Sequence, residues 1–391
     1  PPARRRTSPE TACDRLKRPP VMRITSIETL RVALPCDGFG PKPEAGPGLR
    51  AWDKMESLIL RLQTEDGREG WGEAFGHTVN PGTEAILKSV VGPWFLGKDA
   101  GAIDATMLAA QRAFHTFGRG GPMIYALSAF DIALWDLAAQ RAGQPLFRLL
   151  GGGEPRVKLY ASLMPYGGDA EAIARNCRRA SDAGFAMVKL HEKTVPAFMA
   201  GREALDASIP LALDVNCPWT VDEALGIARA IKGKGFRWLE EPVFPPEDFA
   251  GLARVRREGV AIAGGENIGS LEEFRRAFEA KALDVAQPSV AKIGGIGEMR
   301  RVIALAAEHG VTVMPHCFYW GPGYLATAHL AAAMKPSPPV ETPFIGFERR
   351  PHLLFGIGKG ELTLNETPGL GFEPDWDVLN RHMIGRHTVL G

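Results

Sequence analysis

The chain has 391 residues, which is long enough for two domains or for one large barrel-type domain. Hydrophobic residues make up 45% and charged residues 23% of it, as is usual for a globular enzyme, and its formal charge of +1 argues against nucleic acid or an anionic membrane as the main partner. The five cysteines form no Cys-x-x-Cys pair, which favours a reduced, cytoplasmic setting over a disulfide framework. We find no apolar run that approaches the roughly 20 residues of a membrane span.

The first part of the chain carries a β-like pattern. Residues 1–21 are rich in Pro and Arg and lack the apolar core of a signal peptide, so we expect a disordered tail or a non-native leader. Alternation of polar and apolar residues then predicts a strand over residues 23–34 and a β-hairpin over residues 56–75. The segment 35–52 between them is dense in Gly and Pro and is predicted to be a surface spacer or a lid.

Helical spacing follows the hairpin. Residues 83–97 and 102–116 predict two helices, and residues 117–152 predict a long amphipathic helix that ends at a Gly run. Asp131 and Asp136 lie within this last helix among Ala, Leu and Trp. We expect them to serve helix packing or capping rather than catalysis.

From Val157 onward, eight short apolar runs alternate with helical stretches. This alternation predicts a parallel (β/α) barrel rather than an open sheet. Polar residues stand where the runs end, at intervals of 23 to 27 residues: His191, Asp214, Glu240, Glu266, Ser289, His316 and Glu341. In such a barrel the active site lies at the carboxyl ends of the strands, so these side chains are expected to converge.

Three of these strand-end residues are acids with equal spacing. Asp214 and Glu240 are 26 residues apart, as are Glu240 and Glu266. Like charges at close range are unfavourable, and carboxylates without an accompanying Cys select a hard cation. The triplet therefore predicts a site for Mg²⁺, with Mn²⁺ as the alternative, and Asn216 is expected to lie just behind the ligands.

The candidate bases lie on two other strands. Lys189 and His191 alternate at one strand end, so both point to the same side, and the cation of Lys189 is expected to lower the pKa of His191. His316 ends the seventh strand, across the barrel from His191, where Glu341 could orient it or share a proton with it. Phe318, Tyr319 and Trp320 are expected either to wall the pocket or to pack behind it. A metal beside such a base suits removal of the α-proton of a small carboxylate substrate, through an enediolate.

These residues resemble the mandelate racemase and muconate lactonizing branch of the enolase superfamily. The similarity rests on GWGEA (70–74), the helix sequence of residues 126–152, the acids in DVN, EEP and GEN, and KIGG (292–295). It implies a (β/α)₇β barrel, one Mg²⁺ per subunit on the three acids, a loop that closes over substrate, and a homo-oligomer between dimer and octamer. Together with the pattern, it predicts a capping α+β domain (22–150), a barrel (151–350) and a C-terminal segment (351–391) that returns to the capping domain.

The chain departs from this family at the positions that decide the reaction. Relatives usually carry Lys-x-Lys on the second strand, whereas His191 here takes the place of the second Lys, so either Lys189 or His191 could be the base. Ser289 stands where racemases have the Asp that supports the seventh-strand His, and Lys292 is expected to be structural. Without that Asp, His316 should be less readily cationic. These departures favour dehydration of an acid sugar or related hydroxy acid, with His191 as base and His316 as acid.

Two alternatives stay open at this stage. One keeps the same proton abstraction but ends in racemisation, epimerisation or lactonizing cycloisomerisation. The other is a binding or structural relative without turnover.

Overall fold

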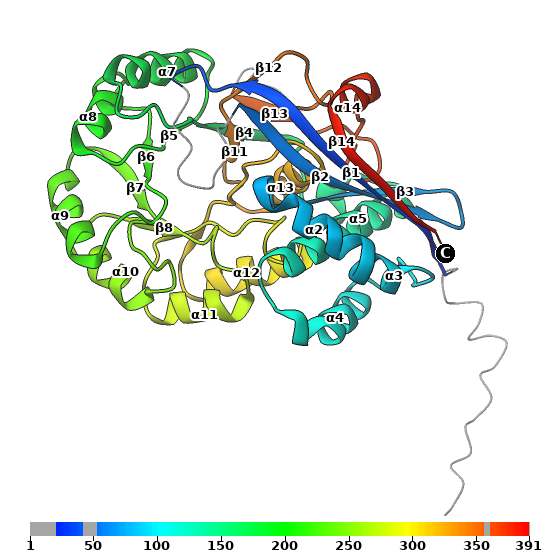
Figure 1. Cartoon of the computed structure of the whole chain (residues 1–391). Helices are drawn as coiled ribbons and strands as arrows, with labels where there is room; N and C mark the ends of the chain where they lie inside the picture. Colours follow the sequence, from blue (N-terminus) through cyan, green and yellow to red (C-terminus); the bar gives the residue numbers. More distant parts are fainter. Residues whose placement is uncertain (1–20, 42–52, 356–359, 391) are drawn as a thin grey trace, which may run out of the picture.

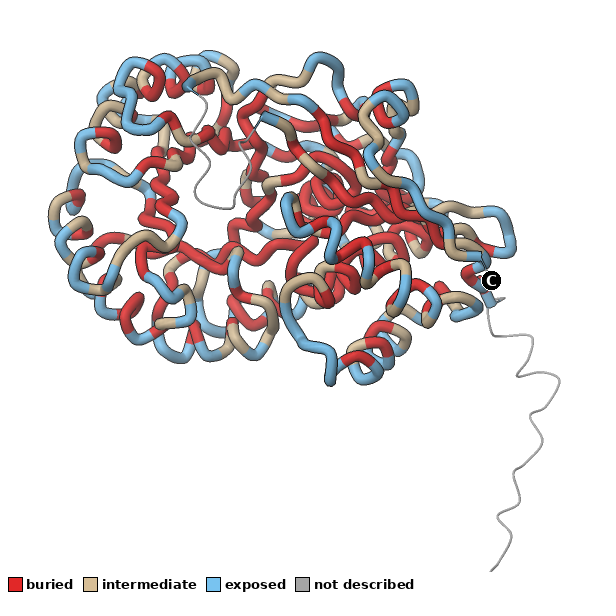
Figure 2. The backbone as a smooth tube through the Cα atoms, in the orientation of Figure 1, coloured by how far each residue is buried: buried red, intermediate tan, exposed pale blue. Residues whose placement is uncertain are grey.

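The computed structural model describes residues 21–41, 53–355 and 360–390 and contains a barrel beside a smaller α+β unit (Figure 1). The leader predicted over residues 1–21, except Val21, and residues 42–52 of the predicted lid lie outside the described residues. Figure 2 shows that burial is concentrated in the barrel strands and where the two units meet.

The small unit is built on an antiparallel sheet. Its members are β1 (Ile24–Asp37), β2 (Lys54–Thr64), β3 (Glu69–Ala74), β12 (Gly346–Phe347) and β14 (Met383–Leu390). Strands β2 and β3 form the predicted hairpin, and Gly67 takes a positive φ of 82° in its turn. β14, drawn in red in Figure 1, pairs with β1, so this last described strand belongs to the sheet of the small unit. The domain boundaries expected after residues 150 and 350 stay a prediction.

The helices of the small unit cover this sheet. They are η1 (His77–Val79), α2 (Asn80–Ile86), the π-helical turn η2 (Leu87–Val91), α3 (Gly92–Phe95), α4 (Ile103–Phe114), η3 (His115–Phe117), α5 (Pro122–Arg141) and α6 (Leu146–Leu149), with α14 (Trp376–His382) near the C-terminus. The helices predicted over residues 83–97 and 102–116 are therefore confirmed.

Helix α5 is not amphipathic, contrary to the sequence prediction. It packs against β3 on one side and against α4, α12 and α13 on others, so 14 of its 20 residues are buried. By length and composition this helix could cross a membrane, which the sequence survey overlooked, but 78% of its most apolar stretch is buried inside the protein. Asp136 accepts hydrogen bonds from the N–H groups of Trp71 (2.9 Å) and Leu370 (2.8 Å), and Asp131 accepts one from Gly297 (3.0 Å).

The barrel contains the eight predicted parallel strands. They are β4 (Arg156–Ser162), β5 (Val188–Leu190), β6 (Leu211–Asp214), β7 (Phe236–Glu240), β8 (Ile262–Gly264), β9 (Val285–Ala286), β10 (Thr312–Val313) and β11 (Val340–Pro343). Each pairs with the next along the chain from β4 to β10, and β11 pairs with β4. The short strand β13 (Glu361–Thr363) pairs in the antiparallel sense with the first residues of β4, Arg156 to Lys158.

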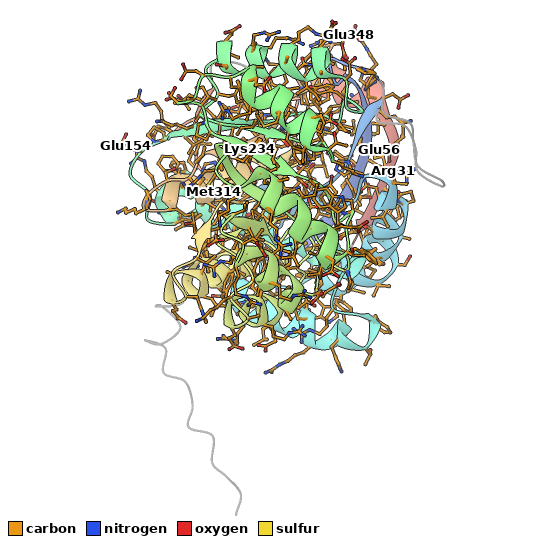
Figure 3. The ribbon with its side chains drawn as sticks, turned by 90° about the vertical axis from the view of Figure 1, so that its left-hand side faces the viewer. Arg31, Glu56, Glu154, Lys234, Met314 and Glu348 are labelled. Carbon is orange, nitrogen blue, oxygen red and sulfur yellow. The ribbon has the colours of Figure 1, made fainter. Side chains whose placement is uncertain are left out.

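Seven helices connect these strands and confirm the predicted (β/α)₇β architecture. They are α7 (Ala170–Asp182), α8 (Val195–Glu203), α9 (Val221–Ile231), α10 (Phe249–Arg256), α11 (Leu271–Glu279), α12 (Ile296–Glu308) and α13 (Pro322–Ala333). The first five begin after a side chain that accepts a backbone N–H, which fixes where each helix starts. These caps are Asp169, Thr194, Thr220, Asp248 and Ser270. In the side view of Figure 3, Lys234 lies on the barrel, whereas Arg31 and Glu56 mark the small sheet.

Candidate functional site

The barrel interior consists of an apolar layer beneath a charged one. The apolar layer comprises Tyr160, Met187, Ala212, Trp238, Ala263, Val285 and Met314. Because successive residues of a strand alternate between faces, the next inward positions on β5, β6 and β7 are Lys189, Asp214 and Glu240. The apolar layer therefore closes the barrel from below, and the charged residues form the floor of its carboxyl-terminal mouth.

Lys189 is the centre of a buried ion cluster in this floor. Its Nζ lies 3.0 Å from Asp214 Oδ2, 2.9 Å from Glu240 Oε1 and 2.8 Å from Glu341 Oε1. Burial lowers the pKa of Lys189, but the neighbouring carboxylates raise it well above its usual range. A lysine held in its protonated form cannot accept a proton, so the cluster favours His191 over Lys189 as the base.

His191 stands at the edge of the floor with both ring nitrogens engaged. Its Nδ1 lies 2.5 Å from the carbonyl oxygen of Leu163, and because a carbonyl only accepts, Nδ1 carries a proton. Its Nε2 lies 3.1 Å from Asp214 Oδ2, and because a carboxylate only accepts, the protonated ring donates in this contact. Burial lowers the pKa of His191, but the charge of Asp214 raises it above its usual range. The expected lowering by Lys189 is present but smaller, so the predicted direction of the net pKa shift is wrong.

His316 pairs with an acid that the sequence analysis had assigned only to the metal. Its Nε2 lies 2.8 Å from Glu266 Oε2, and its Nδ1 has no hydrogen-bond partner among the described residues. Burial raises the pKa of Glu266, but Lys292 and His316 lower it well below its usual range. A carboxylate therefore supports His316 even though residue 289 is a Ser.

Neither Ser289 nor Glu341 forms a hydrogen bond with His316 among the described residues. The Ser289 hydroxyl lies 3.1 Å from the hydroxyl of Tyr319. Glu341 pairs with Lys189 through one oxygen and accepts the N–H of Cys317 through the other, at 2.9 Å. The structure records no hydrogen bond between Glu341 and His316 among the described residues, so the direct contact predicted for this pair is not found. Glu341 instead holds Lys189 and the residue after His316.

Lys292 and Asn216 lie beside the floor. Lys292 Nζ is 3.5 Å from Asn267 Oδ1 and 4.5 Å from the centre of the Phe75 ring, which fits the expected structural role. The N–H of Asn216 donates to Asp214 Oδ1 at 3.1 Å and so fixes the orientation of that carboxylate.

Trp320 does not wall the pocket. Its side chain is fully buried and is absent from the described cavity wall, and its carbonyl oxygen accepts a hydrogen bond from His352 at 2.6 Å. Phe318, which the sequence also offered for the pocket wall, does line the cavity.

A cavity of about 330 Å³ opens above the charged floor. Its described lining comprises Phe75, His77, Met164, Pro165, His191, Lys193, Asp214, Asn216, Glu266, His316 and Phe318. Glu240, Lys189 and Glu341 lie deeper than this wall and are fully buried. The sequence analysis missed five members of the lining, because none of them ends an apolar run of the barrel.

Two of the missed residues come from the small unit. Phe75 and His77 follow β3, and the N–H of Phe75 donates to the Ala291 carbonyl of the barrel at 3.3 Å. Burial lowers the pKa of His77 to about 4, although a hydrogen bond with the Phe318 backbone opposes this shift. The pattern GEAFGHT gives no signal that this turn reaches the barrel mouth, since only the long-range packing brings it there.

Glu73 ties the same strand of the small unit to the barrel. It is 1% exposed, and its carboxylate accepts the Ser57 hydroxyl at 2.5 Å and the N–H of Gly323, at the start of α13, at 3.0 Å. A Cβ added at Gly321 would come within 2.9 Å of Glu73, so this close approach requires glycine there. Because α13 directly follows the turn that bears His316 and Phe318, Glu73 fixes the position of that turn.

The floor has more negative than positive charge. It gathers five carboxylates and two lysines: Asp214, Glu240, Glu241, Glu266 and Glu341 with Lys189 and Lys292. Burial and the charge of Asp214 raise the pKa of Glu240, and burial and the charge of Glu266 raise that of Glu241 to about 7. These oxygen donors fit a hard divalent cation. In the described part of the chain no three of them already surround one point as ligands; Lys189 and His316 contact their oxygens.

Two family models match the chain. The model for the mandelate racemase / muconate lactonizing enzyme N-terminal domain matches residues 49–151, and the enolase C-terminal domain-like model matches residues 172–378. The second match alone spans more than half of the chain, and it contains every strand-end residue of the site from Lys189 to Glu341.

Named relatives catalyse more than one reaction. A 3,6-anhydro-alpha-L-galactonate cycloisomerase of Streptomyces coelicolor is 33% identical over 85% of this chain and 92% of its own length. An arabinonate dehydratase of Saccharolobus solfataricus is 29% identical over 81% of this chain and 88% of its own length. A crystal structure of L-talarate dehydratase from Polaromonas sp. JS666, complexed with Mg and L-glucarate, superposes with a TM-score of 0.79 at 26% identity, covering 95% of this chain and 99% of that one.

Proposed function

The chain belongs to the mandelate racemase / muconate lactonizing enzyme branch of the enolase superfamily, and on that premise we propose that it is an Mg²⁺-dependent acid-sugar dehydratase. In this proposal Asp214, Glu240 and Glu266 hold the ion. When bound, Mg²⁺ neutralises the substrate carboxylate and so makes the α-proton more acidic. The ligands in the solved relative, Mg and L-glucarate, support this assignment.

The observation that carries the proposal is the placement of two histidines on the wall of one cavity. His191 and His316 follow strands β5 and β10, which lie on opposite sides of the barrel, and each faces a carboxylate of the floor. One base and one acid flanking a substrate are what the loss of water requires. A racemase would use two bases at these same positions. Analysis of the product is therefore needed to distinguish dehydration from racemisation.

The proposed chemistry assigns each residue one role. Because Nδ1 of His191 donates to the Leu163 carbonyl, Nε2 is the nitrogen that takes the α-proton, and it does so in the neutral ring, when Asp214 is turned away from it. The electron pair of that C–H bond moves into the carboxylate as an enediolate, which Lys189 helps to stabilise electrostatically from below. His316 then gives a proton to the departing β-hydroxyl, the C–O bond breaks, and water leaves. The resulting enol becomes a 2-keto acid.

A second candidate function is cycloisomerisation. The 33% identity to a cycloisomerase over most of both chains favours it specifically. It would use the same proton abstraction by His191, followed by opening or closure of a ring without net loss of water.

Substrate and setting complete the proposal. We propose that the small ligand is a carboxylate and that the protein is a cytoplasmic homo-oligomer between dimer and octamer. We also propose that it binds neither nucleic acid nor membrane, in keeping with its near-zero net charge.

Product analysis in D₂O tests this function. The Mg²⁺-loaded protein is incubated with a set of hydroxy and sugar acids, and products are followed by NMR and by trapping of 2-keto acids. Water loss with 2-keto-acid formation is expected. Deuterium at the α-carbon of a stereoisomer, or a ring-opened product without water loss, would overturn dehydration in favour of the other reactions of the family.

A further inference from the structure

One cation on the cavity wall is not used by the proposed reaction. Lys193 lines the cavity and is exposed, and its ammonium forms no hydrogen bond or ion pair with any residue that the structure describes. The two other lysines of the site differ, because Lys189 is held by three carboxylates and Lys292 lies against Asn267 and the Phe75 ring. Lys193 thus presents a positive charge to whatever fills the cavity.

The backbone on both sides of Lys193 is fixed. Glu192, which is 5% exposed, accepts the N–H of Tyr166 at 2.6 Å and that of Gly168 at 2.9 Å. Thr194 is the N-cap of α8 and accepts the N–H of Ala197 at 3.4 Å. Lys193 therefore belongs to a tethered turn at the start of a helix, whose dipole adds positive potential near its ammonium.

Among the residues that the structure describes, the rest of the wall offers no group that would neutralise this charge. Its two acids, Asp214 and Glu266, belong to the floor and face His191 and His316. The remainder of the described lining above the floor is apolar or uncharged, including His77, whose pKa is lowered to about 4. A sugar acid with one carboxylate would bind that group at the floor and would bring only hydroxyls to Lys193.

We propose that Lys193 binds a second carboxylate, at the end of the substrate remote from the reacting carbon. The substrate would then be a dicarboxylic sugar acid rather than a monocarboxylic one. This inference rests on the proposed function, since it assumes that the first carboxylate binds at the metal floor. The inference concerns Lys193 alone, and Lys193 is not one of the strand-end residues that form the floor.

Substrate pairs that differ only at the terminal carbon test it. Galactarate is compared with D-galactonate, and D-glucarate with D-gluconate, because each pair shares its stereochemistry and differs by a carboxylate in place of a CH₂OH group. We expect the dicarboxylate of at least one pair to be preferred. Lys193→Gln should lower kcat/KM for that dicarboxylate about tenfold more than for its monocarboxylate, or about 1.4 kcal/mol. The preference should also weaken with added salt, as a partly exposed ion pair would.

Lys234→Gln is the matched control. Lys234 is exposed in the turn between α9 and β7, which enters β7 at the end opposite the cavity, and the variant loses the same charge (Figure 3). It should leave the ratio between the two acids as in the parent protein. A parent that prefers the monocarboxylates, or a Lys193→Gln variant that slows both members of a pair equally, would overturn the proposal.

Failure of the proposed reaction can be separated from failure of this inference. If no acid is turned over, titration calorimetry with the same pairs and the Mg²⁺-loaded protein measures binding alone. Tighter binding of the dicarboxylate that is lost in Lys193→Gln would support the second-carboxylate site without the reaction. Equal binding of both members, or a preference that the variant retains, would refute it.

Discussion

Replacing Lys189 by methionine should strongly destabilise the metal-free protein. The ammonium is the shared partner of Asp214, Glu240 and Glu341, at 3.0, 2.9 and 2.8 Å, and all four side chains are almost completely buried. Methionine has a similar length, so little cavity is created and the change is mainly the loss of charge. Removing one partner of a buried ion pair costs about 3–5 kcal/mol, since the remaining charges stay uncompensated. We expect a loss of that size in the free energy of unfolding.

Urea unfolding in EDTA measures this loss. Trp238 lies in the layer below and donates its Nε1–H to Glu240 Oε2 at 3.0 Å, so it is one of the eight tryptophans whose fluorescence follows this unfolding. Lys158→Met is the control, because Lys158 is exposed on β4 and its loss should change the stability by no more than about 0.5 kcal/mol. Saturating Mg²⁺ should recover more stability in Lys189→Met than in the parent, because it would neutralise the same carboxylates. An unchanged unfolding midpoint of Lys189→Met in EDTA would refute the charge-balance argument.

Three further predictions concern the metal, the acid and the link between the two units. Glu266→Gln should weaken Mg²⁺ binding at least about tenfold by calorimetry, and EDTA should abolish turnover of the parent. His316→Asn should reduce water loss at least about 100-fold while α-proton exchange in D₂O, catalysed by His191, continues; loss of both would contradict the separate roles. Burial raises the pKa of Glu73 from 4.5 to about 7, so the folded state binds this proton more tightly than the unfolded state, and stability should fall as pH rises from about 4.5 to 7. Glu73→Gln should flatten that slope by about 3 kcal/mol in total, and a slope equal to that of the parent protein would show that Glu73 does not titrate there.

The barrel and its floor could be predicted because their signals are local. A barrel strand can be recognised from a short apolar run, and the helix between two strands can be recognised from its 3.6-residue period. The equal spacing of Asp214, Glu240 and Glu266 was therefore enough to place them at the ends of successive strands. The two-residue spacing of Lys189 and His191 similarly predicted that their side chains lie on the same side of the strand, and both do point into the barrel mouth.

The partners of these residues could not be predicted in the same way. Whether Glu266 or Glu341 contacts His316 depends on side-chain directions across the barrel, and the strand-end register alone made Glu341 the candidate, whereas Glu266 is the observed partner. The same dependence on packing explains why α5 was wrongly predicted to be amphipathic. Its apolar residues cover most of its surface because it lies between the small sheet and the barrel helices. Its period could not show that both sides would be covered.

The least predictable residues are those of the cavity wall, and this has a physical reason. Floor residues must sit at strand ends, where the barrel geometry brings them together whatever the rest of the chain does. Phe75, His77 and Lys193 instead reach the cavity from a turn of the small unit and from the tethered segment before α8, so their placement depends on how separate elements pack. In the proposed roles, reaction type and substrate choice thus depend on separate sets of residues. A change at Lys193 should shift the preference among acids while the floor keeps its metal site, whereas a change at Glu266 should remove turnover of every acid alike.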